Sequence, residues 1–137
     1  GASAVSELSV SVVSVDRNVW SGTASMVVAK TPEGEIGIMA GHEPVLSLLV
    51  NGVVRVHASD GTKVVVAVHG GFVAMDSNQV RVLAEAAELA QDIDLGRAQA
   101  ALAKAQADDS DEARAAALRA ETRVRAATSI TAAGLQH

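Results

Sequence analysis

The sequence predicts an α+β fold, in which an N-terminal antiparallel β-sandwich is followed by a C-terminal two-helix hairpin. The main observation is a change of composition near residue 90. Before it, valine-rich runs are separated by Gly, Asn, Asp and Ser, whereas alanine and regularly spaced charges dominate after it. We therefore expect a sandwich domain over residues 5–90, a helical hairpin over 91–127 and a disordered tail over 128–137.

The first part of the chain has the pattern of half-buried strands. Leu8, Val10 and Val12 alternate with serines, which is the period of a strand with one buried face. Asn51-Gly52 separates two apolar runs by two residues and predicts a tight hairpin. Regular spacing of strands with no helix between them is typical of an antiparallel sandwich or flattened barrel. The expected strands, eight or more, cover about 8–12, 24–29, 36–39, 45–50, 53–57, 63–68, 71–75 and 80–83.

The second part of the chain has the pattern of two helices. Asp94 stands where an N-cap is expected, and the apolar residues from Leu95 to Ala105 recur on nearly one helical face. The acidic run over 108–112 ends this helix and opens a second one, of about residues 111–127. Only Leu118 and Val124 are large apolar residues in the second helix. We therefore expect a marginally stable, mobile hairpin that can detach from the sandwich.

Length, charge and composition narrow the classes of function. At 137 residues the chain is long enough to bury a core, and 49% of its residues are hydrophobic. It has no cysteine, which excludes disulfides and thiol chemistry. A net charge of −5 without a basic stripe argues against nucleic acid as a partner. The uncharged apolar run from Val45 to Val54 is too short to span a bilayer, and no signal-peptide pattern opens the chain.

The segment from Gly34 to Leu49, GEIGIMAGHEPVLSLL, is the strongest candidate for a functional loop. Its glycines permit bends, and Pro44 favours a turn. His42 is a contact residue, a metal ligand or a structural loop histidine. Without cysteines or a second histidine at ligand spacing we predict no metal site, and the residues alone favour a structural role.

No catalytic set is predicted. His69-Gly70-Gly71 is similar to the oxyanion-hole HGG of esterases, but no G-x-S-x-G nucleophile elbow is present. A glycine pair at a strand end that allows close packing is the better interpretation. The chain also lacks a nucleophile with a matching base, so we expect a protein that is not an enzyme.

Four ordered motifs carry a resemblance to a known family. The segment G-E-I-G-I-x-x-G-H-x-P-V-L-x-x-L over 34–49 resembles the signature loop of the epsilon subunit of bacterial F-type ATP synthases. Residues 68–72, 82–85 and 93–98 support it in the same order. The resemblance implies a non-catalytic central-stalk subunit of the rotor, peripheral to the cytoplasmic face of the cell membrane. Such a subunit couples gamma to the c-ring and inhibits ATP hydrolysis through its mobile hairpin, without a required cofactor.

The resemblance also implies specific sites. Glu35 and His42 are carried over as contacts to the c-ring, although Ala40 replaces the proline usual before the Gly-His pair. Some members bind ATP as a regulatory ligand through an I/L-D-x-x-R-A motif, together with an upstream glutamate and two arginines. In this chain the matching residues are Glu88, Ile93, Asp94, Arg97, Ala98, Arg119 and Arg123. The inhibitory helix, which meets the alpha/beta catalytic head when the hairpin extends, has Arg114, Arg119, Arg123 and Arg125.

Other interpretations stay open at this point. From the residues alone, a helix cap at Asp94 with Arg97 in solvent is the favoured interpretation, and the arginine series is also explained as a solvated helix face. A stand-alone nucleotide-sensing protein with the same architecture would share Asp94 and Arg97 but ignore gamma. A cupin-like metal protein would need a histidine cluster, and the histidines here lack H-x-H spacing.

Overall fold

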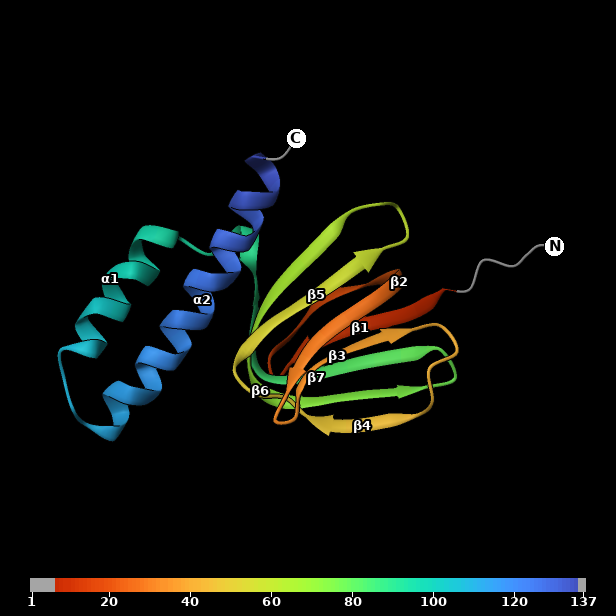
Figure 1. Ribbon diagram of the computed structural model, residues 1–137, viewed down its shortest axis with the longest axis horizontal. Helices are drawn as coiled ribbons and strands as arrows, with labels where there is room; N and C mark the ends of the chain where they lie inside the picture. Colours follow the sequence, from red (N-terminus) through yellow and green to blue (C-terminus); the bar gives the residue numbers. More distant parts are fainter. Residues whose placement is uncertain (1–6, 136–137) are drawn as a thin grey trace.

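The computed structural model describes the backbone of residues 7–135 and the side chains of residues 7–129. It confirms the α+β class, because a β-sandwich precedes two helices (Figure 1). The strands are β1 (Leu8–Ser14), β2 (Arg17–Thr31), β3 (Gly34–Met39), β4 (Val45–Leu48), β5 (Gly52–Ala58), β6 (Lys63–Asp76) and β7 (Gln79–Leu89). A short 3-10 turn, η1 (Ala90–Asp92), leads to α1 (Leu95–Gln106) and α2 (Asp111–Leu135).

The sheet closes on itself. The strand order is β1-β7-β6-β5-β2-β3, and β1 also pairs with β2, while β4 is attached to β6. All of these pairs are antiparallel except β1–β7, which is parallel. The prediction of an antiparallel sheet therefore holds for every pair but one. β3 and β4 each pair with only one strand of the described sheet, so each leaves an edge.

The expectation of eight or more strands is wrong for the described residues, which form seven. The runs 63–68 and 71–75 belong to one strand, β6, which passes through Gly70 and Gly71 at φ values of +76° and +119°. A Cβ on Gly71 would clash with the carbonyl oxygen of Leu83. The glycine pair thus allows the close packing that was predicted, but inside a strand rather than at its end.

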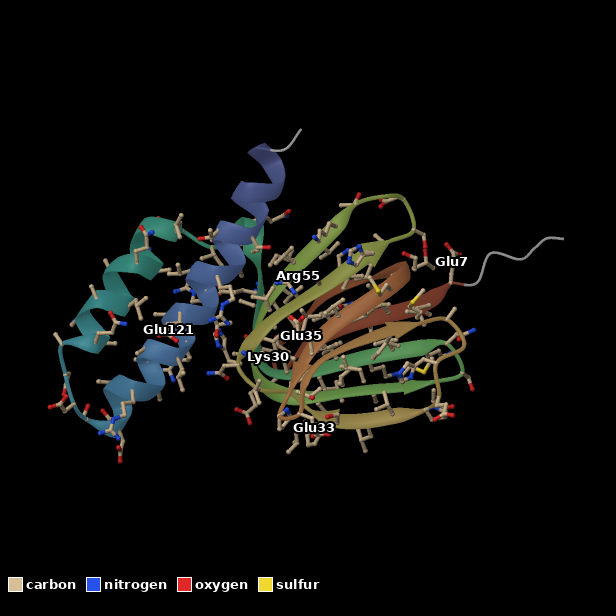
Figure 2. The ribbon with its side chains drawn as sticks, in the orientation of Figure 1. Glu7, Lys30, Glu33, Glu35, Arg55 and Glu121 are labelled. Carbon is tan, nitrogen blue, oxygen red and sulfur yellow. The ribbon has the colours of Figure 1, made fainter. Side chains whose placement is uncertain are left out.

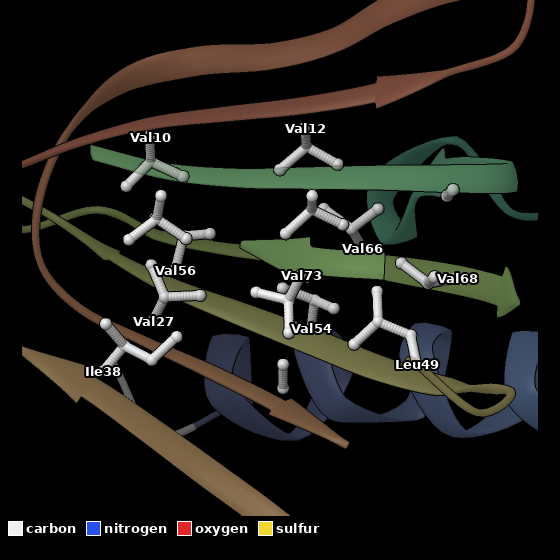
Figure 3. Close-up of a cluster of buried hydrophobic side chains, with 14 of the residues drawn as sticks. Val10, Val12, Val27, Ile38, Leu49, Val54, Val56, Val66, Val68 and Val73 are labelled. Atoms are coloured by element: carbon white, nitrogen blue, oxygen red, sulfur yellow. The ribbon is translucent and has the colours of Figure 1, made fainter. Parts of the chain in front are cut away.

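The sandwich encloses a core made almost entirely of aliphatic side chains (Figure 3). Alternate residues of β1, β2, β5, β6 and β7 point inward, and many are fully buried. Burial of each such side chain contributes about 1.5–3 kcal/mol relative to exposure. This first core cluster takes its buried members only from residues 8–87, so no helix residue belongs to it.

The hairpin rests on the outer face of the sandwich, with α2 between α1 and the sheet (Figure 1). A second core cluster joins the two parts. Its members on the sheet are Val53 of β5 and Val65 and Ala67 of β6, and its members on the helical side are Ala90, Ile93, Ala98, Ala126 and Ala127. The helices are thus held mainly by alanines, whose small side chains bury little area each.

Both helices begin as predicted, but α2 is longer than expected. The Asp94 side chain accepts a hydrogen bond from the backbone N–H of Arg97 at 3.1 Å, which makes it the N-cap of α1. We expected α2 to end near residue 127 and a disordered tail to begin at 128, but the helix continues to Leu135. Thr128 and Ser129 have low helix propensity, yet adding a residue to an existing helix is easy once its first turn has formed. Residues 136 and 137 of the predicted tail lie outside the described residues.

Candidate functional site

An exposed apolar row crosses the outer surface of four neighbouring strands. Leu48 of β4 pairs with Phe72 of β6, Phe72 with Leu83 of β7, and Leu83 with Val13 of β1. Residues paired in register project from the same face of a sheet. Leu48 is 56%, Phe72 48% and Leu83 51% exposed, while Val13 is half-buried. Large exposed side chains that are contiguous are typical of a surface that binds another protein.

The apolar row continues into a hollow of about 590 Å³ at one end of the sandwich. Leu46, which is 73% exposed, lines it together with Ala74 and Arg81. These three residues are in register across β4, β6 and β7, so they form the next row on the same face. The outer surface of this sheet therefore combines an apolar strip with a cavity and a guanidinium group.

Glu35 and His42 lie at opposite ends of β3. Glu35 is the second residue of β3, and its Oε2 lies 3.3 Å from Nη1 of Arg55. His42 follows the strand in a turn, where its backbone N–H donates to the carbonyl oxygen of Met39 at 3.0 Å. Its ring Nδ1 is 2.7 Å from the carbonyl oxygen of Glu43. The two predicted contact residues are therefore separated by the length of one edge strand.

Three of the seven predicted nucleotide-binding residues meet in one pocket. Glu88 of β7 and Arg119 and Arg123 of α2 line a cavity of about 380 Å³ between the hairpin and the sheet. Nε of Arg123 is 2.6 Å from Oε1 of Glu88, and Nη2 is 3.4 Å from Oε2. This bidentate pair closes one wall of the pocket and fastens α2 to β7.

The other four predicted nucleotide-binding residues do not line this pocket. Ile93 and Ala98 are buried in the second core cluster. Asp94 and Arg97 are exposed at the start of α1, where the carboxylate of Asp94 caps the helix. The structure thus confirms that Asp94 caps α1. The guanidinium of Arg97 forms no ion pair among the described residues.

His69 also lines the cavity between the hairpin and the sheet, which we call the hairpin pocket. The sequence did not predict this position. Nδ1 of His69 is buried and has no hydrogen-bond partner among the described residues. Burial lowers the pKa of His69 below 6.5, with Glu88 acting to raise it and Arg119 and Arg123 acting to lower it. His69 pairs with Ala86, two residues before Glu88, and this pairing brings it close to the glutamate. Only the β6–β7 register reveals this proximity, so the linear sequence contains no signal for it.

The arginines of the predicted inhibitory helix have different surroundings. Arg114 pairs with Asp111 at 3.3 Å on the solvent side, and Arg123 pairs with Glu88. Arg119 and Arg125 have no ion pair with any described residue. In this arrangement α2 is docked on the sandwich, and Arg123 is the one of these four arginines that forms an ion pair with a sandwich residue.

Comparison with known proteins agrees with this architecture. The family model for the ATP synthase delta/epsilon chain, beta-sandwich domain, matches residues 7–90. An ATP synthase epsilon chain of Streptomyces avermitilis is 51% identical over 111 residues, covering 80% of this chain and 90% of the relative. One of Nocardia farcinica is 44% identical and covers 96% of this chain and 98% of the relative. The chain therefore belongs to the ATP synthase delta/epsilon family and is of the epsilon type.

Solved structures share the fold at low sequence identity. A chain of the Euglena gracilis mitochondrial ATP synthase, solved as OSCP/F1/c-ring, matches with a TM-score of 0.73 and 22% identity. The match covers 96% of this chain and 84% of the other. A chain of the Tetrahymena thermophila mitochondrial ATP synthase, solved as central stalk/c-ring, gives a TM-score of 0.53.

Two further observations concern membranes and metals. Neither described helix is long and apolar enough to cross a membrane. Within residues 7–129, no three His, Asp or Glu side chains gather in a way that would hold a metal ion.

Proposed function

We propose that this chain is a non-catalytic central-stalk subunit of a bacterial rotary ATP synthase and couples the gamma subunit to the c-ring. The observation that carries the proposal is the exposed apolar row of Val13, Leu48, Phe72 and Leu83. A rotor subunit must transmit torque through a stable interface, and such interfaces are centred on buried apolar and aromatic side chains. The names of the relatives and of the solved complexes support this assignment.

Binding to gamma tests this interface directly. The double variant Phe72→Ser/Leu83→Ser should lose co-purification with the gamma subunit of the same synthase, because both side chains would be at the centre of the contact. Val15→Ser is the matched control, since Val15 is exposed but lies in the β1–β2 turn outside the apolar row. Unchanged thermal unfolding would show that the double variant folds. Wild-type binding by that folded variant would refute the proposal, and a monomer that ignores gamma would favour the stand-alone sensor.

The contact with the c-ring is proposed to run along β3. Glu35 and His42 lie at the two ends of this edge strand, so both touch one partner only if the partner follows the strand. With gamma on the apolar row and the c-ring on β3, the chain would lie peripherally at the cytoplasmic face of the membrane. Glu35→Ala and His42→Ala should each lower proton-coupled ATP synthesis in the assembled complex. Full coupling in the double variant would remove both residues from the contact.

The hairpin is proposed to regulate ATP hydrolysis as a two-state switch. Its docked state is held by the second core cluster and by the Glu88–Arg123 pair, and extension of the hairpin would break both. When extended, the helix would present Arg114, Arg119, Arg123 and Arg125 to acidic surface of the alpha/beta head. Replacement of all four by Gln should raise hydrolysis by the complex without changing gamma binding. Lys104→Gln on α1 is the control, and an unaltered rate in the fourfold variant would exclude these charges as inhibitory.

ATP is proposed as a regulatory ligand of the hairpin pocket. Two arginines suit phosphate oxygens and Glu88 suits a hydroxyl or amine, but Arg123 must first leave Glu88. Calorimetric titration with ATP and Mg-ATP should give heat that disappears in Arg119→Gln, which lines the pocket. Arg97→Ala, outside the pocket, shows whether the bound nucleotide also reaches the start of α1. Asp94→Ser separates capping from binding, because serine also caps a helix but has no carboxylate. Absence of heat from the parent chain would reject the nucleotide site.

A further inference from the structure

A second pocket, separate from the hairpin pocket, has an unusual concentration of positive charge. It has a volume of about 290 Å³ and lies where the outer face of β2, β3 and β5 meets α2. Its lining residues are Lys30, Glu35, Val53, Arg55 and Arg125. Three cations and one carboxylate give a local charge of +2 in a chain whose net charge is −5. We refer to these five residues as the cationic pocket.

Strand register explains why residues distant in sequence converge here. Lys30 of β2 is in register with Glu35 of β3, and Val28, two residues before Lys30, is in register with Arg55 of β5. Residues two apart on a strand share a face, so Lys30, Glu35 and Arg55 all project from the outer side of the sheet. Figure 2 shows these three side chains on the side that α2 covers. Arg125 completes the set from the helix.

Only one of the three cations has a counter-charge. Arg55 pairs with Glu35 at 3.3 Å, and Glu35 remains largely in solvent. Lys30 and Arg125 form no ion pair with any residue that the structure describes. Like charges around a small cavity repel each other, and an anion placed between them relieves that repulsion.

The floor of the pocket lies against the stem of Lys30, and its apolar wall strengthens the attraction between this lysine and an anion. A Cβ on the buried Gly52 would stand 3.2 Å from Cβ and Cδ of Lys30, so the absence of a side chain there lets the lysine stem lie against β5. Val53, which is 4% exposed, gives the pocket an apolar wall. Charges beside an apolar wall act through a lower effective dielectric than charges in open water.

We propose that the cationic pocket binds a small oxyanion of the phosphate type, held between the sandwich and α2. Its volume is at the lower limit of the roughly 300–1,000 Å³ of pockets that hold drug-sized ligands, which suits inorganic phosphate better than a nucleotide. The guanidinium groups of Arg55 and Arg125 match pairs of phosphate oxygens, and Lys30 adds a point charge. The pocket shares no lining residue with the hairpin pocket, so the two sites are distinct.

Phosphate in this position would also favour the docked hairpin. It contacts Arg125 on α2 and Lys30 and Arg55 on the sheet, so it binds best when the two surfaces are together. A ligand shifts a conformational equilibrium by the difference of its affinities for the two states. This consequence rests on the proposed hairpin switch, whereas binding itself does not.

The test is a titration of the full chain with inorganic phosphate, in which amide NMR shifts are measured at each step. Chloride is the balancing anion that keeps the ionic strength constant. Saturable shifts should appear around Lys30, Arg55 and Arg125. Lys30→Gln and Arg125→Gln should each weaken binding by about tenfold, since each removes one charge-assisted contact. Lys104→Gln and Arg17→Gln are matched controls, because both are exposed cations that line neither pocket.

Three results would overturn the proposal. Shifts that do not saturate, or that weaken equally in the control variants, would mean a general ion atmosphere. Loss of binding in Arg119→Gln with full binding in Arg125→Gln would place phosphate in the hairpin pocket. If a dicarboxylate such as succinate bound more tightly than phosphate, the ligand of the pocket would be a carboxylate, such as an acidic side chain, and not a phosphate. None of these results depends on gamma or the c-ring, so they are separable from the central-stalk proposal.

Discussion

At the scale of single residues, the Glu88–Arg123 pair is the main polar contact between hairpin and sandwich. Its side chains are 26% and 33% exposed, and its geometry is bidentate. Neutralising the carboxylate of such a pair costs about 1–2 kcal/mol of unfolding free energy, because the bidentate, charge-assisted contact is reduced to one neutral acceptor. We expect that loss for Glu88→Gln in urea titrations. Arg114→Gln should change stability by less than about 0.5 kcal/mol, since its pair with Asp111 is largely in solvent. Equal losses of stability in Glu88→Gln and Arg114→Gln would contradict the expected difference between a partly buried and an exposed ion pair.

His69 gives stability a predictable pH dependence. Burial is the main cause that lowers its pKa from 6.5 in the folded chain, while an unfolded chain has the ordinary value. Between these two values the unfolded state binds more protons, so stability is complete above about pH 6.5 and declines as pH falls through the folded pKa. His69→Gln should flatten the decline in thermal midpoint measured from pH 7 downward, and His57→Gln is the control. A decline of the same size in His69→Gln would assign it to other groups.

Gly71 shows how one missing side chain determines the path of a strand. Both Gly71 and Gly61 have positive φ, at +119° and +90°, but only Gly71 has backbone where a Cβ would stand. Gly61→Ala should cost about 1 kcal/mol from backbone strain alone. Gly71→Ala adds a clash with Leu83 and Ala84 and should cost more than about 3 kcal/mol in chemical denaturation. Similar losses in the two variants would mean that the clash relaxes freely.

At the scale of elements, α1 should be the least protected part of the fold. It contacts mainly α2, and its buried residues are only Ala98 and Ala105. Helices held by so little apolar area open more readily than strands of a closed sheet. Amide exchange in α1 and α2 should therefore be faster than in β6 and β7. Slow exchange of uniform rate across both helices and the core strands would show that the hairpin does not open independently.

How far the sequence predicts these elements depends on how local the signals are. The strand runs and the cap at Asp94 are set by neighbouring residues, and both are present. The hairpin predicted at Asn51-Gly52 is wrong, because β4 pairs with β6 while β5 pairs with β2 and β6, so the two strands beside this turn are not partners. The continuity of β6 was missed because a glycine pair usually ends a strand, and here the close approach to Leu83 needs it inside one. The end of α2 was missed because helix propagation overrides the weak propensity of Thr128 and Ser129.

The candidate sites are harder to predict, because they depend on register between distant strands. Phe72 and Leu83 become neighbours only through β6–β7 pairing, so the apolar row has no signature in the linear sequence. The cationic pocket draws on three strands and a helix for the same reason. The resemblance to known epsilon subunits supplied Glu88, Arg119 and Arg123 together, and those three do share a pocket. It implied no functional role for His69, although this residue stands in one of its motifs, and none for Lys30.

At the scale of the whole molecule, the two core clusters divide the protein unequally. The first has all its buried members in the sandwich, whereas the second exists only where the hairpin covers β5 and β6. Deletion of residues 91–137 would uncover Val53 and Val65, whose burial contributes at most about 3–6 kcal/mol together. The entropy of ordering the hairpin opposes that gain, so the net coupling between the two parts is smaller.

We therefore expect the chain truncated after residue 90 to fold cooperatively, with a lower thermal midpoint than the full chain. Its newly exposed valines should promote association, and Val53→Ser/Val65→Ser in the truncated chain should suppress it while preserving the first core cluster. Calorimetry and sedimentation would follow both effects. If the truncated chain stays unfolded even with the two serines, the hairpin is part of the folding unit. It could not then move between docked and extended states while the sandwich stays bound to gamma.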